Sequence, residues 1–247
     1  MFDDDPEFGK FVANFPNNRL RLLLTSGAIL ATVWFVVTVA LWQVEANLAS
    51  VITVGIVSLA ALGVGWYVAH FWNRELTMYQ RGFSYREGSH VVFISYAEII
   101  ALRQQAERRV YFGGLLKRIV YRTTLKTTKD ENIVLNNLYR RMDELNLRLE
   151  QETIRLLKPM IERSMANGEK VPFGDFLSLN ATGIYQHRIA ANPYHDDPPL
   201  LWTDFAGYQI EGGRLILRSK AQGDWGSIPL ESIDNLRLLL ELLQKRP

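Results

Sequence analysis

Two long apolar stretches dominate the first third of the chain. Leu22 to Val44 and Ala46 to Asn73 contain no Asp, Glu, Lys or Arg. Each exceeds the roughly 20 residues that a helix needs to cross about 30 Å of hydrocarbon, and neither shows the polar face of a long soluble helix. The first stretch is too long for the apolar region of a signal peptide, and a second one follows it. The pattern therefore predicts a transmembrane helical hairpin over residues 20–73.

The charges around these stretches predict an orientation. The loop "QVEAN" between them has no Lys or Arg. Basic residues instead flank the outer ends of the hairpin, at Lys10, Arg19, Arg21, Arg74, Arg81 and Arg86. Because basic residues favour the cytoplasmic side of a membrane, we expect both termini and everything after Asn73 in the cytoplasm.

Small residues within the hairpin suggest how its helices pack. Gly27 and Ala31 are four residues apart, as are Ala61 and Gly65. In an antiparallel hairpin centred near Glu45, the two pairs lie at the same depth. Small residues at equal depth let two helix backbones approach closely, so these four predict the packing face.

Residues 1–19 form a separate N-terminal segment. Phe8, Phe11, Val12 and Phe15 recur at the spacing of one helix face, and Pro16 follows them. The spacing predicts a short cytoplasmic amphipathic helix. It would lie either in the bilayer interface or against the protein's own domains.

Beyond Asn73 the apolar positions alternate instead. "LTMYQRGFSYREGSHVVFISYAEIIALRQ" has the period of β-strands, and "RRVYFGGLLKRIVYRTTLKT" continues it through a turn at Gly113-Gly114. Leu138, Met142, Leu145 and Leu149 then mark a helix face, with Pro159 expected to end or kink the helix and Gly168 to stop it. Residues 74–168 thus predict several strands followed by a long helix.

The tail, residues 169–247, repeats this plan. "ATGIYQHRI" matches "QRGFSYREG", with Gly183 in the place of Gly82. "LLWTDF" matches "FISYAEI", and "GSIPLESIDNLRLLLELLQ" echoes "ENIVLNNLYRRMDELNLRLE". The repetition predicts two copies of one unit, each made of strands closed by a helix.

The unit resembles the pleckstrin-homology-like (PH-like) domains of bacterial membrane proteins. In those domains an aromatic-x-acid-apolar strand follows the first strands, and a C-terminal helix plugs one end of a bent barrel. The corresponding residues are Tyr96-Ala97-Glu98-Ile99 and Trp202-Thr203-Asp204-Phe205. A transmembrane hairpin followed by such domains is similar to a bacterial family of unknown function, and the resemblance covers most of residues 16–247. It implies an α+β protein of the bacterial inner membrane with two PH-like units, 74–168 and 169–247, each an antiparallel bent sheet or barrel closed by a helix.

The first unit carries the basic charge. Residues 73–168 hold 17 Lys and Arg against 11 Asp and Glu, a net charge of +6. On one strand face Arg118, Arg122 and Lys126 lie in a row, with Arg108 and Arg109 on the preceding strand. This face is either a solvated sheet surface or a contact for anionic lipid, where each cation adds about 1 kcal/mol. The membrane tether and the acidic second unit argue against nucleic acid.

Candidate chemistry is sparse. The chain has no cysteine and no phosphate-binding loop or metalloprotease motif. His195-Asp196-Asp197 is a dense ligand-like cluster in a proline-rich loop, but a metal site needs three or four convergent ligands. We therefore expect no metal, cofactor or catalytic residues.

These features together favour a non-enzymatic function. We expect a membrane-anchored cytoplasmic binding or scaffold module, in the manner of an accessory subunit of a membrane complex, with anionic-lipid contact by the first unit. Its partners would be membrane lipids and either another protein or further copies of itself. Two alternatives stay open: an enzyme or enzyme regulator acting on a membrane substrate, and a scaffold that assembles through its sheet edges.

Overall fold

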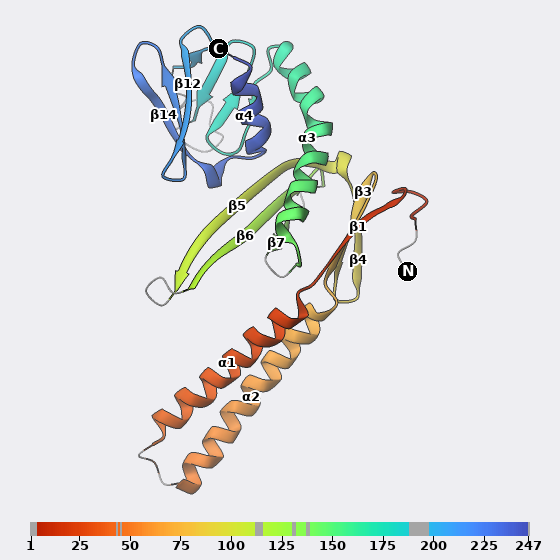
Figure 1. Cartoon of the computed structure of the whole chain (residues 1–247), viewed down its shortest axis with the longest axis vertical. Coiled ribbons are helices and arrows are strands. Elements are labelled where there is room, and N and C mark those ends of the chain that lie inside the picture. The colour runs from red at the N-terminus through yellow and green to blue at the C-terminus, as the bar shows by residue number, and fades with distance from the viewer. Residues whose placement is uncertain are drawn as a thin grey trace. The chain divides into compact units, whose positions relative to one another are not determined.

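The computed structural model of the chain combines two long apolar helices with antiparallel sheets (Figure 1). It describes residues 4–42, 44, 46–111, 116–129, 132–136, 139–187 and 198–246, with the backbone alone for 87, 106–111 and 116–119. The described strands form open sheets of three or four strands rather than closed barrels, so the predicted α+β class is confirmed without a barrel.

The chain divides into two compact units. The first comprises Met1–Ser95 with Leu138–Arg141, and the second comprises Tyr96–Asn137 with Met142–Pro247. The boundaries of these two units differ from the boundaries of the repeat in the sequence. The domain boundaries inferred from the sequence stay predictions.

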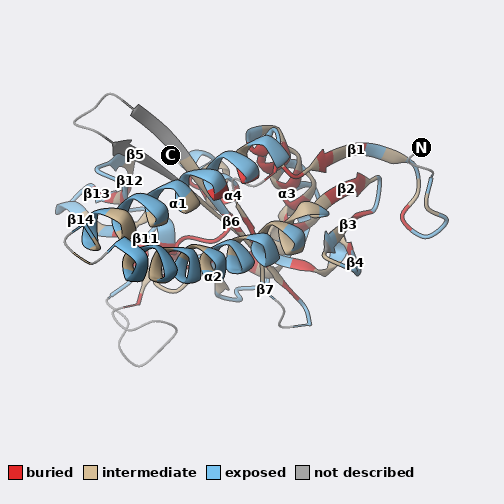
Figure 2. Cartoon of the chain, turned by 90° about the horizontal axis from the view of Figure 1, so that it is seen from below, coloured by how far each residue is buried: buried red, intermediate tan, exposed pale blue. Residues whose placement is uncertain are grey.

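Two apolar helices form the larger part of the first unit. They are α1 (Arg19–Ala40) and α2 (Ala46–Trp72), each with a mean hydropathy of 2.2 and long enough to cross a membrane. Figure 2 shows both helices largely exposed, and the side chains of Leu59 and Trp66 are 71% and 70% exposed. Exposed apolar area of this extent is unfavourable in water, at about 25 cal/mol per Å².

The seam between α1 and α2 differs from the predicted one. Gly27, Ala31, Ala61 and Gly65 are all exposed, and a Cβ added at Gly27 or Gly65 would meet no atom within 4 Å. The less exposed positions recur instead at spacings of three or four residues, at Ser26, Leu30, Val33 and Val37 of α1 and at Val57, Ala60, Val64 and Val68 of α2. Mostly larger side chains therefore fill this seam.

The N-terminal segment is a strand, so the predicted amphipathic helix is wrong. Strand β1 (Phe11–Pro16) pairs antiparallel with β2 (Glu75–Tyr79), with Phe15 opposite Leu76. Both of these side chains are fully buried, whereas Val12 is 41% exposed. Pairing with a distant strand imposes the two-residue period and overrides the local helical spacing.

The apolar hairpin is inserted into a β-sheet. Strands β3 (Gly82–Glu87) and β4 (His90–Ser95) complete the sheet, whose order is β1-β2-β3-β4. Only Asn17 and Asn18 separate β1 from α1, and only Asn73 and Arg74 separate α2 from β2. The hairpin therefore leaves and re-enters the sheet between its first two strands.

Hydrogen bonds join the two ends of the hairpin at this junction. Asn17 donates its backbone N–H to the carbonyl of Arg74 at 3.0 Å, and its side-chain amide donates to Phe71. Asn18 caps α1, because its Oδ1 accepts from the N–H of Arg21 at 3.2 Å. The sheet and the hairpin are thus joined without a slack linker.

Cations stack on aromatic rings at the same junction. The Arg19 guanidinium lies 5.1 Å from the ring centroid of Trp72, and that of Arg74 lies 4.0 Å from the ring of Phe71. Such pairs are attractive because the ring face carries negative potential.

The second unit begins with a three-stranded sheet and a long helix. After the 3₁₀ turn η1 (Tyr96–Glu98) come β5 (Ile99–Tyr111), β6 (Leu116–Thr127), β7 (Asn132–Asn136) and α3 (Met142–Ala166). Pro159 lies inside α3 without ending it, and Gly168, at a φ of 83°, follows it as predicted.

A second set of strands follows in the same unit. A four-stranded sheet contains β8 (Val171–Pro172), β9 (Leu177–Leu179), β10 (Gly183–Gln186) and β11 (Leu200–Leu201). A three-stranded sheet contains β12 (Phe205–Glu211), β13 (Arg214–Ser219) and β14 (Gly223–Pro229). The 3₁₀ turn η4 (Leu230–Ser232) and α4 (Leu236–Gln244) end the chain.

The order of elements occurs twice. Copy one consists of strands β1–β4, strands β5–β7 and helix α3, and copy two consists of strands β8–β11, strands β12–β14 and helix α4. The apolar hairpin is an insertion after the first strand of copy one. Gly82 and Gly183, which occupy matching positions in the sequence, also have matching surroundings in the structure. A Cβ at Gly82 would lie 2.3 Å from the carbonyl oxygen of Ile94, and one at Gly183 would lie 2.3 Å from that of Leu200.

Two further positions match between the copies. The carbonyls of Glu98 and Asp204 accept from the N–H of Thr128 and Lys220 respectively, both at 2.8 Å. The residue before each closing helix has a left-handed backbone, with φ of 54° at Arg141 and 53° at Asn235. The repeat is therefore a repeat of local conformation as well as of sequence.

Gly183→Ala should destabilise the protein by about 2 kcal/mol, because the new methyl group would overlap a backbone carbonyl that cannot move freely. Gly27→Ala is the control, since its Cβ meets open space and alanine is the better helix former. Thermal unfolding of both variants in detergent measures the difference. Equal unfolding midpoints would contradict the close approach at β10.

Candidate functional site

The structure describes the side chains of only two of the five residues in the predicted basic surface. The side chains of Arg108, Arg109 and Arg118 lie outside the described residues, and Arg122 is exposed. Lys126 is engaged, because its Nζ lies 3.0 Å from Oδ2 of Asp234. One of the five predicted lipid-contact residues therefore bonds to the second copy.

Asp234 is the centre of a clamp between the copies. Its side chain is 8% exposed, and its Oδ1 accepts from Nε of Arg103 at 2.7 Å. Arg103 also reaches Asp175, with 3.1 Å between Nη1 and Oδ2. Partial burial lowers the pKa of Arg103, but its hydrogen bonds to the two carboxylates outweigh this effect and raise the pKa.

Asn235 extends the clamp to the backbone of β5. Its N–H donates to the carbonyl of Leu102 at 2.7 Å, and its Oδ1 accepts from the N–H of Leu102 at 2.9 Å. The left-handed conformation of Asn235 turns both groups towards the strand, so the side chain bonds to β5 rather than capping α4. A segment of copy two thus occupies one position on the edge of β5.

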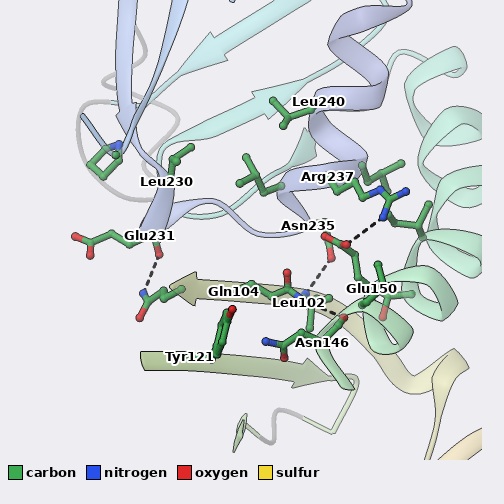
Figure 3. Close-up of a pocket in the computed structure, with 18 of the residues that line it drawn as sticks. Leu102, Gln104, Tyr121, Asn146, Glu150, Leu230, Glu231, Asn235, Arg237 and Leu240 are labelled. Carbon is green, nitrogen blue, oxygen red and sulfur yellow. Dashed lines mark hydrogen bonds and ion pairs between the residues drawn. The ribbon is translucent and has the colours of Figure 1, made fainter. Parts of the chain in front are cut away.

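A groove of about 950 Å³ lies beside this clamp (Figure 3). Its walls come from β5 and β6, from α3, from the β12–β13 turn, and from η4 and α4. Apolar side chains supply much of the lining, at Leu102, Leu147, Ile154, Leu230, Leu236 and Leu240. Leu147 is 46% exposed, which leaves an accessible apolar surface in the groove.

Uncharged polar groups also line the groove. Asn146 is 8% exposed, and its side-chain Oδ1 accepts from the Thr123 hydroxyl at 2.6 Å. The backbone carbonyl of Asn146 accepts from Nε2 of Gln104 at 3.1 Å. The hydroxyl of Thr153, a residue only 1% exposed, has no hydrogen-bond partner in the described part of the chain. A buried hydroxyl without a partner costs about 1–3 kcal/mol.

The charges of the groove are only partly compensated. Arg237 pairs with Glu150, with 3.3 Å between Nη1 and Oε2, and Arg214 donates to Ser227. The carboxylates of Asp143 and Glu231 make no side-chain hydrogen bond or ion pair with described residues. The three carboxylates of the lining, Asp143, Glu150 and Glu231, outnumber its two cations, Arg214 and Arg237, so the groove favours a cationic group in a ligand.

The groove was not predicted from the sequence. Gln104 lies in β5, whereas Asn146 and Thr153 lie in α3, and the three form no motif. The contacts of Asp234 and Asn235 join residues more than 100 positions apart.

The other sequence candidates lie elsewhere. His195, Asp196 and Asp197 are outside the described residues. Across the part that is described, no group of three or more His, Asp or Glu is placed to hold a metal ion. Glu98 forms an ion pair with Lys129 at 3.0 Å, in keeping with a turn acid.

The chain belongs to the family of unknown function DUF6585, whose model matches residues 3–246. No curated protein matches it. The match spans the hairpin and both copies of the repeat, so the inserted hairpin and the two copies are parts of one family unit. The function has to be inferred from the geometry.

Asp234→Ala should destabilise the protein by about 3 kcal/mol, because it leaves Arg103, 18% exposed, without its closest counter-charge. Asp224→Ala is the control. It breaks the ion pair with Arg218 on the surface, where the Asp224 side chain is 65% exposed, and should cost less than about 1 kcal/mol. Denaturant unfolding in detergent compares the two, and equal losses would show that the clamp is no stronger than a surface pair.

Proposed function

We propose that the protein is a membrane-anchored, non-enzymatic binding or scaffold module that presents two PH-like units at the cytoplasmic face of a bacterial inner membrane. The insertion of the apolar hairpin between β1 and β2 carries this proposal. A hairpin that leaves and re-enters one sheet through two-residue junctions holds that sheet directly at the membrane surface.

The exposed helices support the membrane anchor. Among the described residues of α1 and α2, only Leu22 and Ser26 are buried. Lipid tails would cover the remaining apolar side chains, and a 22-residue and a 27-residue helix are each long enough to span the hydrocarbon core.

The charge distribution supports the orientation. Arg19, Arg21 and Arg74 cluster at the junction, together with the ring of Trp72, whereas the loop at the far end of the hairpin has no basic residue. Arginine and tryptophan both favour the headgroup region, and an excess of arginine favours the cytoplasmic side.

The proposed lipid contact shifts towards this junction. Lys126 is occupied by Asp234, so it contributes less to an anionic surface contact than the sequence suggested. The junction arginines would lie at headgroup depth whenever the hairpin spans the bilayer, where each cation adds about 1 kcal/mol.

The order of elements supports the PH-like description. Each copy has four strands in one sheet, three strands in a second sheet, and a closing helix. This order is similar to that of the PH-like domains named above. A module of this kind with few candidate catalytic groups suits binding better than catalysis.

Single cysteines test the anchor and its orientation, because the chain has none of its own. Asn47→Cys lies at the start of α2, and Gln222→Cys lies in the β13–β14 turn. Both positions are exposed. In bacterial spheroplasts, a membrane-impermeant maleimide should label Asn47→Cys directly and Gln222→Cys only after the membrane is permeabilised.

The cysteine-free chain controls for background labelling. Labelling of Gln222→Cys in sealed spheroplasts would contradict the orientation. Release of the protein from membranes by alkaline carbonate would contradict the anchor itself.

A further inference from the structure

We propose that the groove beside β5 binds an extended peptide segment of a partner protein that carries apolar and basic side chains, and that the segment adds to the edge of β5 at Gln104. The inference deepens the proposed function, because it names the class of partner for the binding module. It rests on the edge of β5, on the polar groups of the groove and on its uncompensated charge.

The edge of β5 offers unpaired backbone groups. In the order β5-β6-β7, β5 is an outer strand. The N–H and C=O of Leu102 point away from β6, because both bond to Asn235. Alternate residues of a strand direct these groups to the same side, so the N–H and C=O of Gln104 face outward as well. Neither has a hydrogen-bond partner among the described residues.

The chain itself shows that this edge accepts another segment. Asn235 takes both backbone groups of Leu102, and the side chain of Gln105 donates to the carbonyl of Glu231 at 3.3 Å. Gln104 lies between these two contacts along β5 and lines the groove (Figure 3). The proposed site therefore continues an interface that already exists within the second unit.

The polar lining suits a peptide backbone. Peptide groups are neutral and both donate and accept hydrogen bonds, which matches the amides of Gln104, Asn146 and Asn235. Addition of a strand to a sheet edge uses this combination of backbone bonds and neighbouring side-chain pockets.

The side chains of the ligand follow from the remaining lining. Leu147, Ile154 and Leu240 offer apolar contacts, and Asp143 and Glu231 offer carboxylates without a bonded partner in the described chain. An anionic headgroup or nucleotide would meet these carboxylates unfavourably. A segment with at least one Lys or Arg beside apolar residues is complementary to the groove.

The test uses the full-length protein in lipid nanodiscs and a phage-displayed library of random heptapeptides. Selected peptides should be enriched in Lys or Arg together with apolar residues. Their dissociation constants are then measured for the wild-type protein and for a matched pair of variants at one position.

Gln104→Pro and Gln104→Ala form that pair. Both remove the side-chain bond to Asn146, but only proline removes the outward N–H, and proline is tolerated where an edge strand donates no ladder bond. We expect peptides to bind Gln104→Pro about tenfold more weakly than Gln104→Ala. Equal affinities for the two variants, with equal thermal unfolding midpoints, would overturn the addition to β5.

Leu147→Arg and Leu147→Glu give a second pair at an exposed position, should Gln104→Pro fold poorly. Arginine should abolish binding of the basic peptides, and glutamate should preserve or strengthen it. A library that yields no binding peptides, or peptides insensitive to both pairs, would reject the site. Such a result with the expected maleimide labelling would leave the proposed orientation standing, whereas unexpected labelling with intact peptide binding would reject only the orientation.

Discussion

The pairing of β1 with β2 is the constraint on which the rest of this structure depends. These strands are adjacent in the sheet but separated in sequence by the whole apolar hairpin. Phe15 and Leu76 face each other across the pair and are both fully buried, so the ends of the hairpin are fixed by a core contact. A hairpin attached by one flexible linker would be free to move relative to the sheet. Two short junctions prevent this.

The second unit is held together by a different device. The first half of α3 buries Met142, Leu145 and Leu149, whereas Leu157 and Met165 of its second half join the core of copy two. The Asp234–Asn235 clamp then binds copy two to the edge of β5. A shared helix and a buried ion pair together make one compact body from parts of both copies. The groove forms beside the clamp, where β5, α3 and α4 approach without filling the space between them.

The sequence predicted what depends on long, continuous or repeated patterns. The absence of charge over more than 20 residues predicted both apolar helices, and Gly183 predicted the repeat because its position excludes any Cβ. Local spacing misled where a distant partner decides the conformation. Phe8, Phe11, Val12 and Phe15 have helical spacing, yet pairing with β2 makes the segment a strand. Lys126 looked like a free surface cation, because its partner Asp234 lies 108 residues away.

The most direct test of the inserted hairpin is a disulfide between β1 and β2. Asn14 and Thr77 are paired in the register, and side chains of opposed residues lie close enough to be bridged. In native membranes, oxidation of the double variant Asn14→Cys/Thr77→Cys should give a crosslinked chain, whereas Asn14→Cys/Gln80→Cys should not. Absence of the first crosslink, or equal formation of both, would contradict a sheet that closes around the base of the hairpin.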